Sequence, residues 1–156
     1  VIVNDHLQTT NPKIFAAGDI CMNWKFTHAA DAAARIVIKN TLFSPFGLGR
    51  SKLSDLVMPW ATYTDPEVAH VGLYEREAKD KGIDFETITI PFSSVDRAIA
   101  EGEENGFVKI LYQKGSDKIV GATVVARHAG DLISEISVAM VAKAGLSTLS
   151  TVIHPY

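Results

Sequence analysis

A carboxylate that directly follows a short apolar run is the first feature of this sequence that could do chemistry. Residues 10–19 read TNPKIFAAGD, so the run Ile14–Ala17 leads through Gly18 into Asp19. A continuous apolar run of this length predicts a strand buried on both faces. Open α/β sheets bind their ligands at the carboxyl ends of such strands. Asp19 could there accept hydrogen bonds from ribose or ribityl hydroxyls, although a Gly-Asp pair alone is more typical of a solvated turn.

A histidine at the end of the sequence is the second such feature. His154 is followed only by Pro155 and Tyr156. An imidazole has an intrinsic pKa suited to general acid–base catalysis, whereas a single histidine is more often a polar surface group. Because the sequence starts inside an apolar run at Val1 and stops just after a His-Pro pair, we expect it to be part of a longer enzyme.

A helix is predicted shortly after the Asp19 corner, at residues 27–43, with Thr27 suited to the N-cap position. The first half of this segment is rich in alanine, so it could approach a sheet or a ligand closely. Residues 44–56 change in character and place Pro45, Gly47 and Gly49 among polar residues. This composition predicts a linker.

Residues 57–156 are expected to form a second domain. We predict strands at 58–64, 85–90, 107–112 and 119–126, and helices at 73–81 and 131–144. The last two strands are separated by QKGSDK, which is a hairpin signal. Hairpin pairing favours an antiparallel sheet with helices on one side. The predicted fold class is therefore α+β, preceded at residues 1–43 by the tail of a doubly wound α/β domain.

Composition narrows the classes of function. Of the 156 residues, 47% are hydrophobic, which is too many for a disordered chain. The net charge of -3 argues against nucleic-acid binding, and no apolar run is long enough to cross a membrane. Cys21 is the single cysteine, so neither a disulfide nor a cysteine-rich metal site is expected, and the default compartment is the cytoplasm.

Four segments, in order along the whole chain, together resemble the FAD-dependent pyridine nucleotide-disulfide oxidoreductases, the family of glutathione reductase, dihydrolipoamide dehydrogenase and mercuric reductase. TTNPKIFAAGDI at residues 9–20 is similar to the family's second flavin-binding segment. PWATYTDPEVAHVGL at 59–73 is similar to the opening of its C-terminal interface domain. GFVK and IVGA, at 106–109 and 119–122, resemble its central hairpin, and His154-Pro155 resembles its terminal His-Pro-Thr.

The resemblance implies roles for three residues. Asp19 would bind the ribityl-phosphate part of FAD, and Thr27 would contact the pyrimidine ring of the flavin. His154 would be the general acid/base of a redox dithiol in the partner subunit. The family pairs this histidine with a glutamate a few residues later, past Tyr156. The family's redox cysteine pair lies upstream, so Cys21 is expected to be a packing residue.

The helix predicted at 131–144 is apolar around much of its circumference. An ordinary surface helix has one apolar stripe. This helix could therefore be a core helix of a larger domain, or it could also face a second subunit. The resemblance favours the second interpretation and implies a two-fold homodimer through residues 57–156.

The predicted function is that of the C-terminal part of a flavoprotein that passes electrons from NAD(P)H through FAD and a redox disulfide to a small-molecule acceptor. The alternative is a non-catalytic dimerisation or interaction module of the same fold. Tyr156 in place of the family's threonine favours the mercuric-reductase-like branch. The identity of the acceptor (disulfide, mercuric ion or quinone) stays open. NADH and NADPH also stay open, and the chain alone is expected to be inactive.

Overall fold

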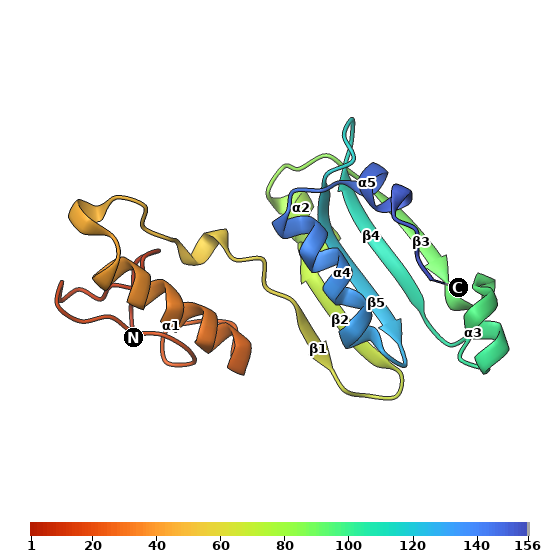
Figure 1. The fold of residues 1–156 in the computed structure, drawn as a ribbon, viewed down its shortest axis with the longest axis horizontal. Coiled ribbons are helices and arrows are strands. Elements are labelled where there is room, and N and C mark those ends of the chain that lie inside the picture. The colour runs from red at the N-terminus through yellow and green to blue at the C-terminus, as the bar shows by residue number, and fades with distance from the viewer. Residues whose placement is uncertain (156) are drawn as a thin grey trace. The chain divides into compact units, whose positions relative to one another are not determined.

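A computed structural model describes residues 1–155 of the chain, and Tyr156 lies outside the described residues. The chain divides into two compact units, Val1–Leu56 and Val57–Tyr156 (Figure 1). Each unit is described by itself below. Among residues 1–155, no helix has the length and apolar character needed to cross a membrane.

The first unit is built around the helix α1 (Thr27–Leu42). Ala29, Ala33, Ile36 and Asn40 are buried, and their spacing places them on one stripe of the helix. Phe26, not Thr27, occupies the N-cap position, and no side chain caps the helix there. The predicted N-cap role of Thr27 is therefore wrong by one residue, since the helix already begins at Thr27.

The two apolar runs before α1 form isolated antiparallel bridges instead of extended strands. Val3 pairs with Thr9, and Gln8 pairs with Phe15. Ala16 is buried, but Ile14 is 53% exposed, so the run is not covered on both faces. A buried strand needs a neighbour on each side to satisfy its backbone groups. Within residues 1–56, each run pairs only through a single bridge to the segment between them, at Thr9 and at Gln8.

Residues 44–56 are hydrogen-bonded to the first unit, where the sequence predicted a linker. The amide of Asn40 donates to the carbonyl of Ser51 at 2.9 Å, and the backbone N–H of Ser51 donates back at 2.8 Å. The carboxylate of Asp5 accepts the N–H of Ser54 at 2.9 Å and its hydroxyl at 2.7 Å. The segment contains two short 3-10 helices, Pro45–Gly47 (η1) and Leu53–Asp55 (η2). It therefore follows a defined path before the second unit begins.

The second unit is an antiparallel five-stranded sheet with helices, as the predicted α+β class requires (Figure 1). The strand order is β1-β2-β5-β4-β3. The strands are β1 (Trp60–Thr62), β2 (Glu67–Gly72), β3 (Phe85–Pro91), β4 (Phe107–Gln113) and β5 (Ile119–Ala126). The helices are α2 (Glu75–Asp80), η3 (Phe92–Ser94), α3 (Asp96–Glu101), α4 (Ala129–Val141) and α5 (Leu146–Thr151).

The main core lies between the sheet and α4, which crosses β1, β2 and β5 in Figure 1. Strand alternation places Ala69 and Val71 of β2 on the same face as Ala122 and Val124 of β5, and the register pairs Ala69 with Val124 and Val71 with Ala122. Four buried residues of α4 cover this face: Ala129, Ile133, Ile136 and Ala139. Burial of this one face fixes the register, because a slip by one residue would expose every apolar side chain.

Side chains on the opposite face of the sheet surround a buried histidine. His70 of β2 is 3% exposed and stacks on Tyr74 with ring centroids 3.7 Å apart. Its Nδ1 lies 2.9 Å from the hydroxyl of Thr123, and its Nε2 lies 3.2 Å from the carbonyl of Gly72. A carbonyl can only accept, so Nε2 carries the proton and Nδ1 accepts from Thr123. His70 is thus held as a neutral imidazole with both nitrogens hydrogen-bonded.

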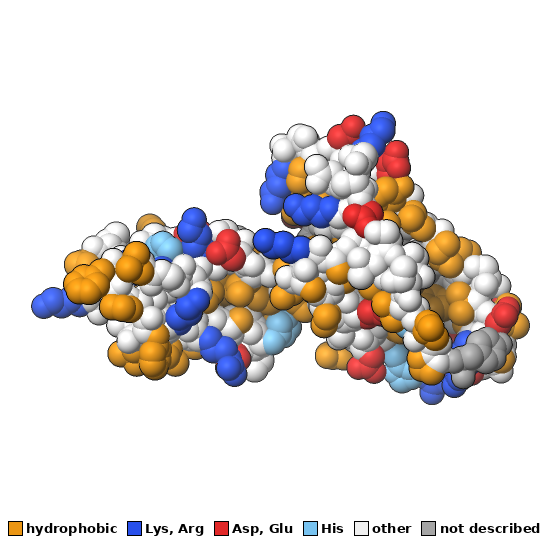
Figure 2. Space-filling view, turned by 45° about the horizontal axis from the view of Figure 1, so that its top comes forward, with side chains coloured by type: hydrophobic (Ala, Val, Ile, Leu, Met, Phe, Trp, Pro, Cys, Tyr) orange, Lys and Arg blue, Asp and Glu red, His pale blue; other side chains and the backbone are white. Residues whose placement is uncertain are grey.

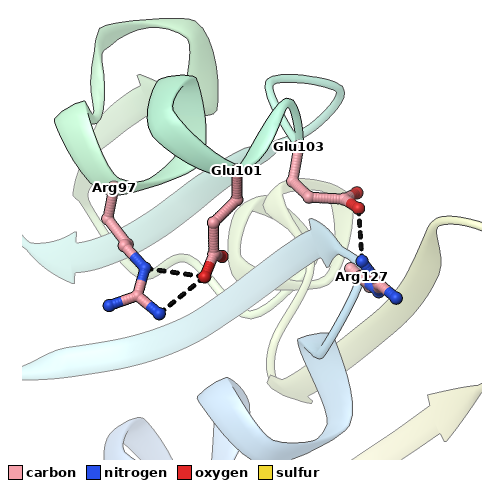
Figure 3. A network of polar contacts seen from close by, with 4 residues as sticks. All are labelled: Arg97, Glu101, Glu103 and Arg127. Carbon is pink, nitrogen blue, oxygen red and sulfur yellow. Dashed lines mark hydrogen bonds and ion pairs between the residues drawn. The ribbon is translucent and has the colours of Figure 1, made fainter.

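Two ion pairs involve the acidic residues at the end of α3 and in the turn that follows it. Arg97 reaches Glu101 at 2.6 Å within α3, and Arg127 reaches Glu103 at 2.6 Å from the end of β5 (Figure 3). All four side chains are exposed to solvent, so neither pair contributes much to stability. The second pair nevertheless connects the turn after α3 with the turn between β5 and α4.

Candidate functional site

The Gly18-Asp19 corner lies in the first unit, directly after the bridge at Phe15. Gly18 has φ +82°, which a residue with a side chain rarely adopts. A Cβ atom at this position would also lie 3.2 Å from Cβ of Ala30 in α1. Glycine therefore lets the corner approach the first turn of α1 closely. Asp19 follows Gly18 in the chain and Thr27 is the first residue of α1; the sequence analysis proposed both as flavin contacts.

The loop between Asp19 and α1 is closed by Lys25. Its ammonium group donates to the carbonyl of Asp19 at 2.9 Å and to that of Met22 at 3.3 Å. The backbone N–H groups of Cys21 and Met22 both donate to the carbonyl of Gly18 at 3.1 Å. The loop is thus held by its own backbone, and the carboxylate of Asp19 is exposed.

The N-terminus of α1 could receive a partly negative group of a ligand. Thr27 is exposed, no side chain caps the helix, and its first turn holds no acidic residue. The helix dipole favours negative charge at such an end. The exposed Asp19 carboxylate can accept hydrogen bonds from a polyol. A cofactor with hydroxyls next to an electron-rich ring, such as FAD, therefore fits the residues present.

Cys21 is close to this corner, but its surroundings are those of a packing residue. It is half-buried, and burial raises the pKa of its thiol. A reactive cysteine needs the opposite shift, since the thiolate is the nucleophile. Among residues 1–155, no group of three or more His, Cys, Asp or Glu side chains could hold a metal ion.

His154 lies in the second unit, just after α5. Its Nε2 is 2.7 Å from Oε1 of Glu135 on α4, and both side chains are about half exposed. Glu135 has no sequence signal that would connect it with His154. The two residues are 19 positions apart, so no local spacing connects them, and only the packing of α5 beside α4 brings them together. The next residue after Pro155, Tyr156, is outside the described residues.

The outward side of α4 carries apolar residues that the sheet does not cover. Val138 is 67% exposed and Val141 is 68% exposed. An open groove of about 410 Å³ runs between α4 and α5 and is lined by Val138, Leu149 and Val152 among others. Apolar side chains are visible at the surface along one side of this unit (Figure 2). Contiguous exposed apolar surface of this kind marks an interaction site.

Comparison with known proteins places these features in one family. A model of the pyridine nucleotide-disulphide oxidoreductase dimerisation domain matches residues 58–156. The chain is 35% identical, over its whole length, to a mercuric reductase of Staphylococcus aureus, of which it covers 28%. It is 34% identical over 99% of its length to a dihydrolipoyl dehydrogenase of Buchnera aphidicola, of which it covers 32%. The chain therefore spans about a third or less of the length of these relatives.

Solved structures share the arrangement. LpdA from Mycobacterium tuberculosis matches 99% of this chain with a TM-score of 0.87 and 27% identity, over 33% of its own length. The HOCl-induced flavoprotein disulfide reductase RclA from Escherichia coli matches 99% with a TM-score of 0.84 and 25% identity, over 35% of its length. Since the family model covers well over half of the sequence, the chain belongs to the pyridine nucleotide-disulphide oxidoreductase family, with residues 58–156 as its dimerisation domain.

Proposed function

We propose that this chain is the C-terminal part of an FAD-dependent oxidoreductase that passes electrons from NAD(P)H to a disulfide-type acceptor. Its relatives are named as mercuric reductase and dihydrolipoyl dehydrogenase, and the similar structure from E. coli as a flavoprotein disulfide reductase. The observation that carries the proposal is the close approach of Gly18 and Ala30, because it sets the start of α1 beside the Asp19 corner.

FAD, when bound, would supply the acceptor for the electrons of NAD(P)H and their onward transfer. The carboxylate of Asp19 would accept hydrogen bonds from the ribityl chain. The N–H groups at the start of α1, next to Thr27, would donate to the electron-rich edge of the ring and stabilise negative charge there. Lys25 would keep the loop in place by its bonds to the carbonyls of Asp19 and Met22.

His154 would exchange a proton with a redox dithiol. A thiol must lose its proton before it attacks an acceptor, and the thiolate that is released when a disulfide is reduced must take up a proton. An imidazole within hydrogen-bond reach can perform both transfers. Half exposure of the side chain leaves the ring accessible to a group outside the second unit. Glu135 accepts a hydrogen bond from Nε2, so Nδ1 is the nitrogen that would face the thiol.

The outward side of α4 and the groove beside α5 would form the contact with a second copy. Val138 and Val141 project from α4, and Val152 lines the groove just before His154. A two-fold contact uses the same patch on both copies. The imidazole of one copy would then stand at the edge of the interface, where it could serve the redox centre of the other copy.

The proposal is tested in a protein that carries this chain together with flavin- and nucleotide-binding regions. His154→Gln should lower the rate constant of acceptor reduction by about 100-fold or more, which is the usual loss for a general acid/base. The rate of flavin reduction by NAD(P)H should not change. His128→Gln is the matched control, since His128 is exposed and precedes α4. Equal rates in the His154 and His128 variants would contradict the role of His154.

The flavin site is tested separately. Asp19→Asn should reduce the flavin content of the purified protein or raise the flavin dissociation constant, because the amide replaces a charged acceptor by a weaker one. Asp55→Asn, at an exposed position of η2, is the control. Wild-type flavin content and affinity in the Asp19 variant would remove Asp19 from the site.

A further inference from the structure

The turn of the β4–β5 hairpin holds the start of α5. Oδ2 of Asp117 accepts the backbone N–H of Ser147 at 3.1 Å and also accepts the hydroxyl of Ser147. The carbonyl of Asp117 accepts the N–H of Leu146 at 2.9 Å. Helix α5 has no side-chain cap of its own, since Gly145 is the N-cap residue. Asp117 therefore supplies, from 30 residues away, the cap that the local sequence lacks.

The carboxylate of Asp117 occupies the space that a side chain at Gly145 would need. A Cβ atom at this position would overlap with the carboxylate of Asp117. The backbone of Gly145, with φ -96° and ψ -177°, is extended and would accept any residue. A side chain at Gly145 would therefore displace the carboxylate of Asp117, although the backbone conformation would accept it.

Helix α5 is too short to hold itself in place. It has six residues, well below the length at which an isolated helix is stable in water. Leu146 and Leu149 pack against the main core, whereas Val152 and Ile153 are exposed. The polar contacts that fix the segment are therefore Asp117 at its start and Glu135 beyond its end.

We propose that Asp117 is a positioning residue for His154: by capping α5, it sets the position from which the imidazole reaches the dithiol. This inference rests on the proposed function of His154. The same hydrogen bonds lower the pKa of Asp117, so its side chain accepts as a carboxylate throughout the neutral range. Asp117 touches neither cofactor nor substrate and would act only through the helix.

The test uses the flavin-containing protein and measures the two half-reactions separately. Asp117→Ala should lower the rate constant of acceptor reduction by about tenfold, because a small displacement of a reacting group has a large kinetic cost. Flavin reduction by NAD(P)H should stay at the wild-type rate, which also shows that the variant is folded. Asp117→Asn retains an acceptor oxygen and should restore most of the rate. Asp84→Ala, at an exposed position before β3, is the matched control.

A double-mutant cycle separates positioning from general destabilisation. In the His154→Gln background, Asp117→Ala should have no further effect on acceptor reduction, since there is no imidazole left to position. An equal loss in both backgrounds, or a parallel loss of flavin reduction, would overturn the inference while leaving the proposed function intact. If His154→Gln itself has no effect, the proposed function fails, and the inference fails with it.

A second cycle tests the contact when Asp117→Ala folds poorly. Gly145→Ala should reproduce the loss in acceptor reduction, because its methyl group would displace the carboxylate. In the Asp117→Asn protein, Gly145→Ala should then lower the rate of acceptor reduction by at least the same factor as in the wild type. Wild-type acceptor reduction in the Gly145 variant would contradict the positioning role.

Discussion

Nε2 of His154 lies 2.7 Å from Oε1 of Glu135, so the segment after α5 is tied to the side of α4. Both side chains are about half exposed, and a pair of this kind contributes only about 0–1 kcal/mol to stability. Its consequence is orientation. The hydrogen bond holds one ring nitrogen against α4 and turns the other nitrogen away from it. A general acid/base needs this kind of constraint more than it needs added stability.

Glu135→Ala should therefore lower the rate of acceptor reduction in the flavin-containing protein by about three- to tenfold, because the imidazole loses its orienting partner. Glu135→Gln keeps an acceptor oxygen and should lose less. Rapid-reaction measurement of flavin reoxidation by the acceptor gives the rate. Glu104→Ala, in the exposed turn after α3, is the control. If the Glu135 and Glu104 variants have the same rate, the contact does not orient the catalytic ring.

The outward side of α4 should be the interface between two copies. Val138→Glu would place a charge in that interface and should raise the dimer dissociation constant by about 100-fold or more, since an unpaired buried charge costs several kcal/mol. Sedimentation velocity over a concentration series measures this constant. Ile88→Glu, on the edge strand β3 and 40% exposed, should leave the constant unchanged. An unchanged Val138 variant would place the interface elsewhere.

The long elements of the second unit could be predicted from the sequence because each has a strong local signal. The hairpin of β4 and β5 has two β-branched runs around a turn, and α4 has a sustained apolar pattern. The fold class followed from these elements. The predicted helix 27–43 also formed, as α1, and begins at Thr27 as expected; the N-cap is Phe26 and not Thr27.

The elements that were missed are short or mixed in composition. Helices α3 and α5 have six residues each, fewer than two turns, so no helical period can be recognised in them. Strand β2 includes Glu67 and His70, which hide its apolar face. The contacts of His154 were missed for a related reason: Glu135 and Asp117 are 19 and 37 positions away, and only the tertiary fold defines them.

The close approach of Gly18 and Ala30 can be tested through the free energy of unfolding of the first unit. Gly18→Ala and Gly49→Ala both place a side chain at positive φ, which costs about 1–2 kcal/mol. The Gly18 variant should lose more stability than the Gly49 variant. Its methyl group would be 3.2 Å from Cβ of Ala30, whereas a methyl group at Gly49 would have no neighbour within 4 Å. Trp24 is the only tryptophan of the first unit. Urea unfolding followed by Trp24 fluorescence in a Trp60→Phe background therefore reports on this unit alone.

The same Gly18 variant should also lose flavin in the flavin-containing protein, since displacement of α1 would move its N-terminus away from Asp19. Gly49→Ala should retain flavin, because no backbone hydrogen bond of the described residues joins residues 45–49 to the Asp19 corner. Equal free energies of unfolding and equal flavin contents in the two variants would show that the approach of Gly18 to α1 is not required.

The buried His70 should make the stability of the second unit depend on pH. Burial lowers the pKa of His70 from its ordinary value of 6.5, although the charge of Glu77 partly opposes the shift. The unfolded chain therefore binds the proton more readily than the folded one between the folded-state pKa and 6.5. In that window, the free energy of unfolding should fall as pH falls, by at most about 1.4 kcal/mol per pH unit for one proton. Above pH 6.5 this contribution is fully present.

His70→Phe tests this assignment, because it keeps an aromatic ring against Tyr74 but cannot titrate. The variant should be less stable at pH 8 by about 1–3 kcal/mol, since the hydroxyl of Thr123 and the carbonyl of Gly72 lose their partner. Its stability should fall less steeply than that of the wild type below pH 6.5. Urea unfolding at a series of pH values, followed by Trp60 fluorescence in a Trp24→Phe background, measures both quantities. His128→Phe, at an exposed position, should keep the wild-type slope; a His70 variant with that same slope would mean that another group binds the proton.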